Sequence, residues 1–185
     1  MSGISETTKN SESYERNTMK NIYLIGFMGA GKSTVAAAMC KEYGLSQMEM
    51  DEQIEKEEGM TIPEIFSVKG EPYFREKETG LLERCTGMSN LVVSCGGGAA
   101  MRECNVAEMK KNGKIVWLNV SAETVYERVK DSHNRPLLEG NMNVEYIEEL
   151  LNKRRPKYEA AADVIVDTDK KSLKAICREI MENCR

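Results

Sequence analysis

Short apolar runs alternate along this chain with longer stretches in which apolar residues recur every three or four positions. The runs predict β-strands at 21–25, 46–50, 91–94, 115–120 and 164–166. The longer stretches predict helices at 32–43, 52–58, 62–68, 72–86, 102–111, 121–130, 143–159 and 171–182. This alternation is typical of an α/β fold with a mainly parallel sheet and helices on both of its faces.

Ligands of such folds bind beyond the carboxyl ends of the strands, so the segment after the first strand is informative. It reads GFMGAGKST, residues 26–34, which is the phosphate-loop pattern. Its glycines let backbone N–H groups face phosphate oxygens, Lys32 can reach the phosphates, and the Ser33 hydroxyl can bind Mg²⁺. Because the loop follows a strand and opens a helix, a chance glycine-rich turn is the weaker interpretation. The sequence predicts a nucleoside triphosphate with Mg²⁺ as ligand.

The other motifs narrow the class of phosphate-loop protein. No DxxG occurs, and the only Asn-Lys, at 152–153, is not followed by the residues of a GTPase NKxD motif. The strand at 91–94 is followed by Cys95 and three glycines instead of the aspartate usual in motors and helicases. A small-molecule kinase remains as the best class.

Two carboxylates, Glu49 and Asp51, stand at the end of the second predicted strand. If both belong to the strand, a spacing of two places them on one side, at the crevice. One could then organise the water ligands of Mg²⁺, and the other could hold or deprotonate an acceptor hydroxyl. The alternative is a solvated acidic helix start with Asp51 as its N-cap, and the spacing does not decide between the two.

Two further segments carry arginines that could meet anions. In GEPYFREKE, Arg75 and Glu78 share one helix face, as a surface ion pair or as part of a polar pocket. The polar loop KDSHNRPLLEGN, 130–141, could cover the nucleotide as a lid, with Arg135 on the transferring phosphoryl group. His133 in the same loop is interpreted as a solvated side chain.

Arg154 lies on an apolar helical stripe with Ile147, Leu151 and Tyr158. An arginine on such a face needs a partner or an anionic ligand. Pro156 is expected to kink or end this helix locally.

The run SCGGGAA, 94–100, leaves bare backbone at Gly96, Gly97 and Gly98. Three glycines weaken either a strand or a helix, so a close approach of another group to the chain is expected there. Cys95 beside them is expected to be a buried, unreactive thiol.

Composition and charge restrict the partners. The chain has 185 residues and a formal net charge of −4, which argues against general binding to nucleic acid or a membrane surface. Six cysteines without a CxxC pair, and a single histidine, make a zinc site unexpected. Residues 1–18 are expected to be a flexible tail before one domain at 19–185. No apolar stretch suits a membrane span or a signal peptide, so a cytoplasmic protein is expected.

From about Met19 to its end, the chain resembles the shikimate kinase family. The resemblance rests on several motifs in order, namely GFMGAGKST, EMDEQIE, GMTIPEIF, GEPYFREKE, CGGGA, RPLL, RRPKYEAAAD and VDTD. It implies ATP-dependent phosphorylation of the 3-hydroxyl of shikimate. It also implies a P-loop NTPase fold like that of nucleoside monophosphate kinases, a three-layer sandwich with a five-stranded parallel sheet of order 2-3-1-4-5 and a mobile lid. Such enzymes are often monomers.

The resemblance also implies roles for individual residues. Phosphate binding falls to Gly29, Ala30, Gly31, Lys32, Ser33 and Thr34. Ser33 would bind Mg²⁺, with Glu49 acting on it through water. Shikimate binding falls to Asp51, Arg75, Glu78, Gly96, Gly97, Gly98 and Arg154, where the two arginines clamp the carboxylate, Glu78 supports Arg75, and Gly97 offers its N–H. Catalysis would rest on Lys32, Asp51 and Arg135, while Arg128 and Lys171 would flank the adenine.

Three positions depart from the family pattern. Glu49 stands where an aspartate is usual, Cys95 where threonine or serine is more frequent, and Lys170-Lys171-Ser172 follow VDTD where a proline often occurs. Two rival functions stay open: a related kinase of another hydroxy acid such as gluconate, and a non-catalytic ATP-binding regulatory relative. The arginine pair with CGGGA argues against the first, and the presence of Lys32, Asp51 and Arg135 against the second.

Overall fold

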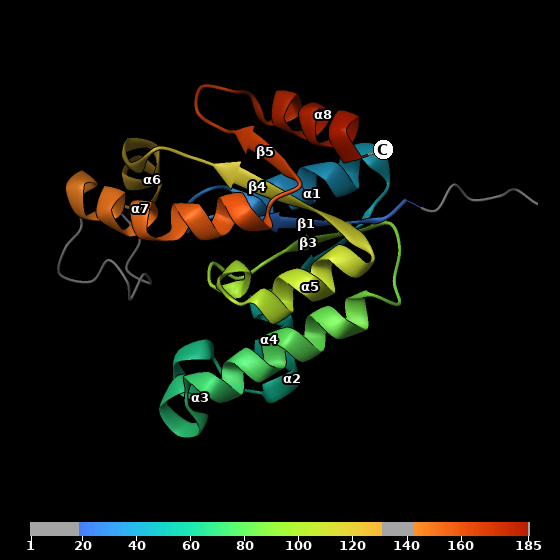
Figure 1. Ribbon diagram of the computed structural model, residues 1–185, viewed down its shortest axis with the longest axis vertical. Helices are drawn as coiled ribbons and strands as arrows, with labels where there is room; N and C mark the ends of the chain where they lie inside the picture. Colours follow the sequence, from blue (N-terminus) through green and yellow to red (C-terminus); the bar gives the residue numbers. More distant parts are fainter. Residues whose placement is uncertain (1–18, 131–142, 185) are drawn as a thin grey trace, which may run out of the picture.

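The computed structural model describes residues 19–130 and 143–184, and its centre is a five-stranded parallel sheet (Figure 1). The strands are β1 (Asn21–Ile25), β2 (Ser46–Glu49), β3 (Leu91–Ser94), β4 (Gly113–Asn119) and β5 (Val164–Asp167). Their order is β2-β3-β1-β4-β5, and every neighbouring pair is parallel. The fold class and strand order expected from the sequence are confirmed.

The helices surround this sheet close to their predicted positions. They are α1 (Lys32–Tyr43), α2 (Met50–Glu58), α3 (Ile62–Lys69), α4 (Glu71–Cys85), α5 (Glu103–Lys111), α6 (Ala122–Val129), α7 (Val144–Ala161) and α8 (Leu173–Cys184), with a short 3-10 turn η1 (Ala99–Met101). Each predicted element is present, and its ends differ by no more than two residues. Within the described ranges, no helix is long and apolar enough to cross a membrane.

Alternating side chains of the buried strands build a separate core on each face of the sheet. From β1, Ile22 and Leu24 join the cluster that includes α1 and α8, while Tyr23 and Ile25 join the cluster that includes α4 and α5. Figure 1 shows these two pairs of helices on opposite sides of the strands. Strand β1 is covered on both faces, so all five of its residues are buried and four of them are apolar. The exception, Asn21, satisfies its side chain by hydrogen bonds to the backbone of Cys85 and Leu91.

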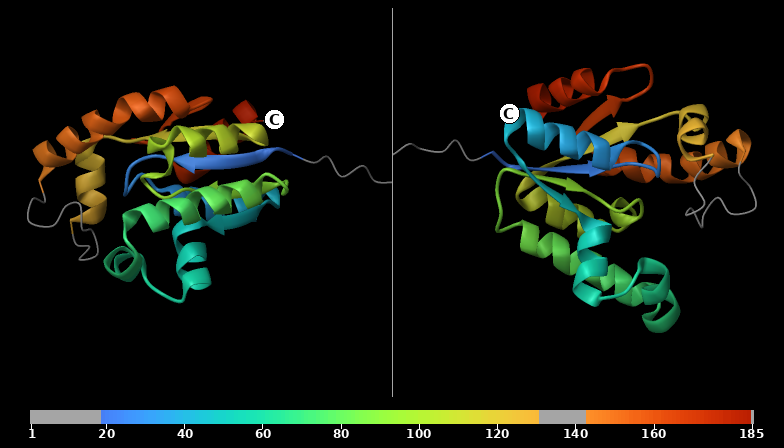
Figure 2. Two further views of the ribbon diagram at one scale, coloured as in Figure 1. Left: turned by 60° about the horizontal axis from the view of Figure 1, so that its bottom comes forward. Right: turned by 180° about the vertical axis from the view of Figure 1, so that it is seen from behind.

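Helices α2 and α3, together with α4, extend away from the sheet on the β2 side, opposite to α8 (Figure 2). Helix α2 begins directly after β2, so these helices start from the carboxyl edge of the sheet. Their side chains can therefore face the phosphate loop, which begins at the carboxyl end of β1. The phosphate loop on one side and helices α2, α3 and α4 on the other therefore form two walls of a candidate site.

Pro156 was expected to kink or end its helix, and the second of these alternatives is wrong, because α7 continues to Ala161. A proline removes one N–H donor, whose acceptor would have been the carbonyl of Asn152. Both residues are exposed, so water can bond that carbonyl instead. The predicted stripe persists through the proline: Ile147, Leu151 and Tyr158 are buried along it.

Two predicted segments lie outside the described residues. They are the tail at 1–18 and nearly all of the lid at 130–141, including His133 and Arg135. Of the lid, only Lys130 is described, and it caps the C-terminus of α6.

The start of α3 offers a test of local stability. Thr61 caps this helix in a reciprocal arrangement, because its Oγ1 accepts from the Glu64 N–H and a Glu64 carboxylate oxygen accepts from the Thr61 N–H. We expect Thr61→Ala to lower the free energy of unfolding by about 1 kcal/mol, the usual effect of losing an N-cap. Thr61→Ser retains the hydroxyl and should keep most of the stability. Urea unfolding measures both, and equal stability of Thr61→Ala and the wild type would contradict the capping role.

Candidate active site

A cavity of about 630 Å³ opens at the carboxyl edge of the sheet. It brings together most of the site residues predicted from the sequence: Gly29, Gly31, Lys32, Ser33, Thr34, Glu49, Asp51, Arg75, Glu78, Gly96, Gly97, Gly98, Arg128 and Arg154. Ala30 is buried within the phosphate loop and is not part of the lining. Arg135 lies outside the described residues, and Lys171 lies away from this cavity.

The phosphate loop depends on glycines at three positions. Gly26, Gly29 and Gly31 have φ angles of 142°, 75° and 93°, a region that other residues rarely adopt. A Cβ at Gly26 would also lie 2.8 Å from the carbonyl oxygen of Leu118 on β4. The loop therefore reaches the N-terminus of α1 in the tight curve that an anion site at a helix N-terminus needs.

Two cations hold this loop in place. The Lys32 ammonium donates to the carbonyl oxygens of Gly26 and Phe27, at 2.9 and 3.1 Å. Arg128 on α6 donates from Nη1 to the carbonyl of Gly29, at 2.8 Å. Lys32 and Arg128 both line the cavity, so the cavity carries positive charge next to the phosphate loop.

Oxygen atoms from three elements meet beside the start of α1. Ser33 Oγ donates to Glu49 Oε2 at 2.9 Å and lies 3.3 Å from Ser94 Oγ. Gln47 Nε2 donates to the other carboxylate oxygen of Glu49, at 2.7 Å. Ser94 and Gln47 were not predicted as site residues. Both lie at or near the carboxyl end of a strand, and this position is the signal by which the sequence could have identified them.

These hydroxyl and carboxylate oxygens fit Mg²⁺, which prefers hard oxygen ligands. In the described part of the chain there is no cluster of three or more His, Cys, Asp or Glu residues that could hold a metal. This agrees with the way phosphate-bound Mg²⁺ is held, by one or two protein groups with phosphate and water completing its shell.

Asp51 does not lie on the strand, contrary to the paired-strand interpretation. Strand β2 ends at Glu49, and α2 begins at Met50, so Asp51 is in the first turn of α2. The alternative is right that an acidic helix begins here, with Asp51 and Glu52 in its first turn, but wrong about the N-cap, which is Glu49. Both carboxylates still line the cavity, because the chain turns from strand to helix at that point.

An ion pair forms the wall of the cavity on α4. Arg75 donates from Nη1 to Oε2 of the buried Glu78 and from Nη2 to Glu71, both at 2.7 Å. The other oxygen of Glu78 has no hydrogen-bond partner among the described residues. Burial raises the pKa of Glu78 and outweighs the opposing effect of Arg75. Asp51 is open to the cavity, yet desolvation by the surrounding walls raises its pKa too, against the effect of Lys32.

The glycine turn after β3 is explained by close approach, since its three residues do not have left-handed φ angles. A Cβ at Gly96 would lie 2.7 Å from Asp51 Oδ1, and one at Gly98 would lie 2.7 Å from Arg75 Nη1. At Gly97 the nearest atom would be Arg154 Nη1, at an ordinary 3.6 Å. Two of the glycines thus make room for side chains of the site, and the third faces the cavity.

The stripe on α7 also reaches this turn. Arg154 Nη1 donates to the carbonyl oxygen of Gly97 at 3.2 Å, and the Tyr158 hydroxyl donates to the same oxygen at 2.9 Å. The Arg154 guanidinium lies 5.5 Å from the centre of the Phe27 ring, in cation–π range. Arg154, for which the sequence alone identified no partner, is therefore held at the cavity, whose lining also includes Arg75.

A partly buried polar network that joins α4 to the segment after the glycine turn was not predicted from the sequence. Arg102 Nη1 donates to the backbone carbonyl of Arg75 at 2.7 Å and to Thr79 Oγ1 at 3.0 Å. Thr79 in turn donates to Asn105 Oδ1 at 2.6 Å, and Asn105 Nδ2 donates to the carbonyl of Ala99 at 3.0 Å. The network ties α4 to the chain that leaves the glycine turn.

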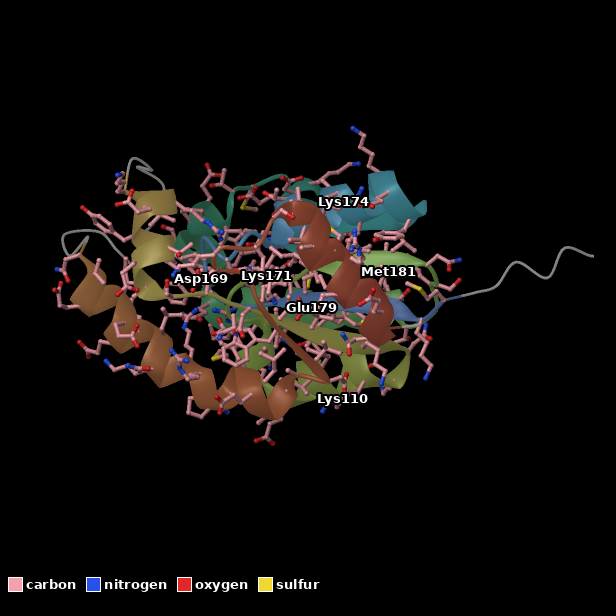
Figure 3. The ribbon with its side chains drawn as sticks, turned by 90° about the horizontal axis from the view of Figure 1, so that it is seen from above. Lys110, Asp169, Lys171, Lys174, Glu179 and Met181 are labelled. Carbon is pink, nitrogen blue, oxygen red and sulfur yellow. The ribbon has the colours of Figure 1, made fainter. Side chains whose placement is uncertain are left out.

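Two further sequence-based expectations concern Lys171 and Cys95. Lys171, two residues before α8, forms an ion pair with Glu179 of that helix at 2.6 Å, and Figure 3 labels both residues. The assignment of Lys171 to the adenine, like that of Arg128, stays a prediction. Cys95 is buried as expected, and burial raises the pKa of its thiol.

Comparison with known proteins identifies a family whose members resemble this chain in sequence and in structure. Residues 28–185 match the family model described as shikimate kinase. This chain belongs to the shikimate kinase family. The shikimate kinase of Persephonella marina is 46% identical over 167 residues, which cover 90% of this chain and all of that protein. The solved shikimate kinase from Acinetobacter baumannii in complex with shikimate has a TM-score of 0.81 and 34% identity, covering 89% of this chain and 92% of that one.

A solved gluconokinase from Sinorhizobium meliloti is more distant from this member of the shikimate kinase family. It has a TM-score of 0.57 and 22% identity, covering 89% of this chain and 91% of that one. At this identity, the likeness shows a shared fold alone. The phosphate-loop kinase fold implies use of ATP and usually of Mg²⁺.

The raised pKa of Asp51 predicts a gain in stability when its charge is removed. The folded state binds the proton of Asp51 more tightly than the unfolded state, so stability falls as the pH rises from the ordinary carboxyl pKa through the raised one. We expect Asp51→Asn to have a higher Tm than the wild type at pH 7, and the difference should vanish as the pH falls below the ordinary carboxyl pKa.

Glu52→Gln is the matched control, because Glu52 shares the first turn of α2 but does not line the cavity. It should not raise the Tm. Thermal unfolding of the ligand-free proteins between pH 3 and 8 decides the question, and a Tm of Asp51→Asn at or below that of the wild type at pH 7 would contradict the account.

Proposed function

We propose that this protein catalyses transfer of the γ-phosphoryl group of ATP to the 3-hydroxyl of shikimate, yielding shikimate 3-phosphate and ADP. The observation that carries the proposal is that Arg75, Arg154 and Asp51 line one cavity together with the phosphate loop, and that they adjoin the glycine turn at Gly98, Gly97 and Gly96 respectively. An acid with several hydroxyls fits a site that has cations at one end and a carboxylate near the phosphates. Membership of the shikimate kinase family supports the same substrate.

The nucleotide end uses the loop and its two cations. Backbone N–H groups of residues 29–34 and the N-terminus of α1 bind the phosphates, and Lys32 moves from its loop carbonyls to the β- and γ-phosphates. Ser33 and Glu49 would hold Mg²⁺, which would neutralise phosphate charge there. Bound MgATP supplies the phosphoryl group and neutralises part of its charge.

The acceptor end orients the other reactant. The planar guanidinium groups of Arg75 and Arg154 can each donate two parallel hydrogen bonds to a carboxylate, which fixes the ring at that end. Glu78 holds Arg75 in place by its buried ion pair. Asp51 accepts the hydrogen bond of the 3-hydroxyl, aims its oxygen at the γ-phosphate, and takes its proton during transfer.

Charge stabilisation should contribute more to the rate than the basicity of Asp51, because the transition state of phosphoryl transfer is loose. Lys32 provides one cation at the transferring group. We propose Arg135 as a second, although it lies in the lid segment outside the described residues. Closure of that segment would keep water from acting as the acceptor.

Gluconate as acceptor, or a purely regulatory ATP-binding role, are the rival functions. The first is disfavoured by the two arginines that line the cavity at the glycine turn, and the second by the presence of Lys32 and Asp51 in the same cavity. A monomeric state and a cytoplasmic location are part of the proposal as well, and size-exclusion chromatography with light scattering would test the first.

One assay decides between these functions. ADP release is measured with MgATP and shikimate, gluconate or no acceptor. Shikimate should raise the rate far above the other two conditions, and Lys32→Ala and Asp51→Asn should each reduce shikimate-dependent turnover at least ~100-fold. Turnover that is absent, or that does not depend on shikimate, would contradict the proposed function. Near-normal turnover of either variant would remove that residue from its role.

Gly97 gives a steric test of where the acceptor lies. A methyl group there meets no protein atom closer than 3.6 Å, so Gly97→Ala should fold normally while intruding on the substrate. Overpacking of this kind typically costs about 1–3 kcal/mol, so we expect the KM for shikimate to rise at least about fivefold with the KM for ATP unchanged.

Gly80→Ala on α4 is the control, because a Cβ at Gly80 meets no atom within 4 Å and Gly80 does not line the cavity. Its KM values should equal those of the wild type. If Gly97→Ala also keeps the wild-type KM for shikimate, the acceptor does not lie against the turn.

A further inference from the structure

The carbonyl oxygen of Gly97 accepts two hydrogen bonds, and its two donors differ in their surroundings. The Tyr158 hydroxyl is 2.9 Å away on a side chain that is only 1% exposed, and its ring stacks on Trp117 with 5.8 Å between centroids. Arg154 is 3.2 Å away and half-buried, with its guanidinium lining the cavity. One donor is fixed inside the protein, and the other faces the space for a ligand.

The proposed function asks Arg154 to serve a second acceptor. A charge-assisted bond from guanidinium to carboxylate is roughly twice as strong as one to a neutral carbonyl. When a carboxylate enters the cavity, Arg154 therefore turns its donors towards it and weakens the long bond to Gly97. Without another donor, the carbonyl of a half-buried turn would lose its partner at the moment the substrate binds.

We propose that Tyr158 is a positioning residue for the acceptor, an inference that rests on the proposed function. Its hydroxyl keeps the Gly97 carbonyl bonded and the glycine turn in place while Arg154 transfers its hydrogen bonds to the substrate carboxylate. Stacking on Trp117 fixes the ring, so the hydroxyl needs no reorganisation when the substrate arrives. Tyr158 itself does not line the cavity.

This role predicts that the effect of losing the hydroxyl appears in the complex. In Tyr158→Phe, Arg154 still satisfies Gly97 in the free protein, and the ring still packs against Trp117. After shikimate binds, one arginine must serve both acceptors. Since a hydrogen bond contributes about 0.5–1.5 kcal/mol net, we expect the Kd and KM for shikimate to rise roughly three- to tenfold. The kcat and the KM for ATP should stay within about twofold.

The chain offers a closely matched control. The Tyr23 hydroxyl is also buried, but it has no hydrogen-bond partner among the described residues, and Tyr23 lies on β1 outside the cavity. Tyr23→Phe removes the same atom from the core and should leave the Kd and KM for shikimate unchanged. Trp117 is the only tryptophan of the chain, so its emission reports whether the stack with residue 158 persists.

Three results would overturn the inference: Tyr158→Phe binds shikimate like the wild type, Tyr23→Phe weakens binding as much, or the loss falls equally on shikimate and ATP. Wild-type protein without shikimate-dependent turnover would instead defeat the proposed function, so the two failures are distinguishable.

A measurement on the wild-type protein decides the matter even if Tyr158→Phe does not fold. The Gly97 carbonyl is labelled with ¹³C and observed through the ¹⁵N amide of Gly98, with and without shikimate. Its chemical shift should stay in the hydrogen-bonded range in the complex. A shift to that of an unbonded carbonyl would show that Tyr158 does not hold it.

Discussion

The part of the site that we propose binds the acceptor depends on one buried ion pair, that of Arg75 with Glu78. A carboxylate with no exposed surface needs a cationic partner, and Glu78 finds it three residues earlier on its own helix. The pair occupies the space that Gly96 and Gly98 leave free, since a Cβ at either position would touch its atoms or those of Asp51. The glycine turn and the ion pair are therefore a single unit, in which each requires the other.

The order of the strands joins this unit to the phosphate loop. Strand β3 pairs with β1, with Leu24 opposite Ser94, so the loop that follows one lies beside the turn that follows the other. The contact between the Ser33 and Ser94 hydroxyls is a direct result. In a sheet in which β1 and β3 were not neighbours, the phosphate loop and the glycine turn would follow strands that lie apart. The sheet topology thus places the arginines that we propose for a carboxylate in one cavity with the loop cations that we propose for a phosphate.

Much of the fold and of the candidate site could be predicted from the sequence, because buried parallel strands and amphipathic helices have strong patterns of apolar residues. The exceptions have physical causes. Strand β2 is short and partly exposed, so its apolar signal was too weak to show that the chain turns into a helix before Asp51. The partners of Gly96 and Gly98 come from distant segments and appear only in three dimensions. Asn105 could have been noticed, since it interrupts the buried face of α5 four residues before Met109.

The central claim is that the two arginines and Asp51 hold opposite ends of one small acid beside the phosphate loop. A crystal structure of the protein with shikimate and ADP tests it most directly. The account predicts the carboxylate between the guanidinium groups of Arg75 and Arg154, the ring against Gly97, and the 3-hydroxyl within hydrogen-bond distance of Asp51. A carboxylate bound elsewhere, or a hydroxyl that points away from the phosphate loop, would contradict it.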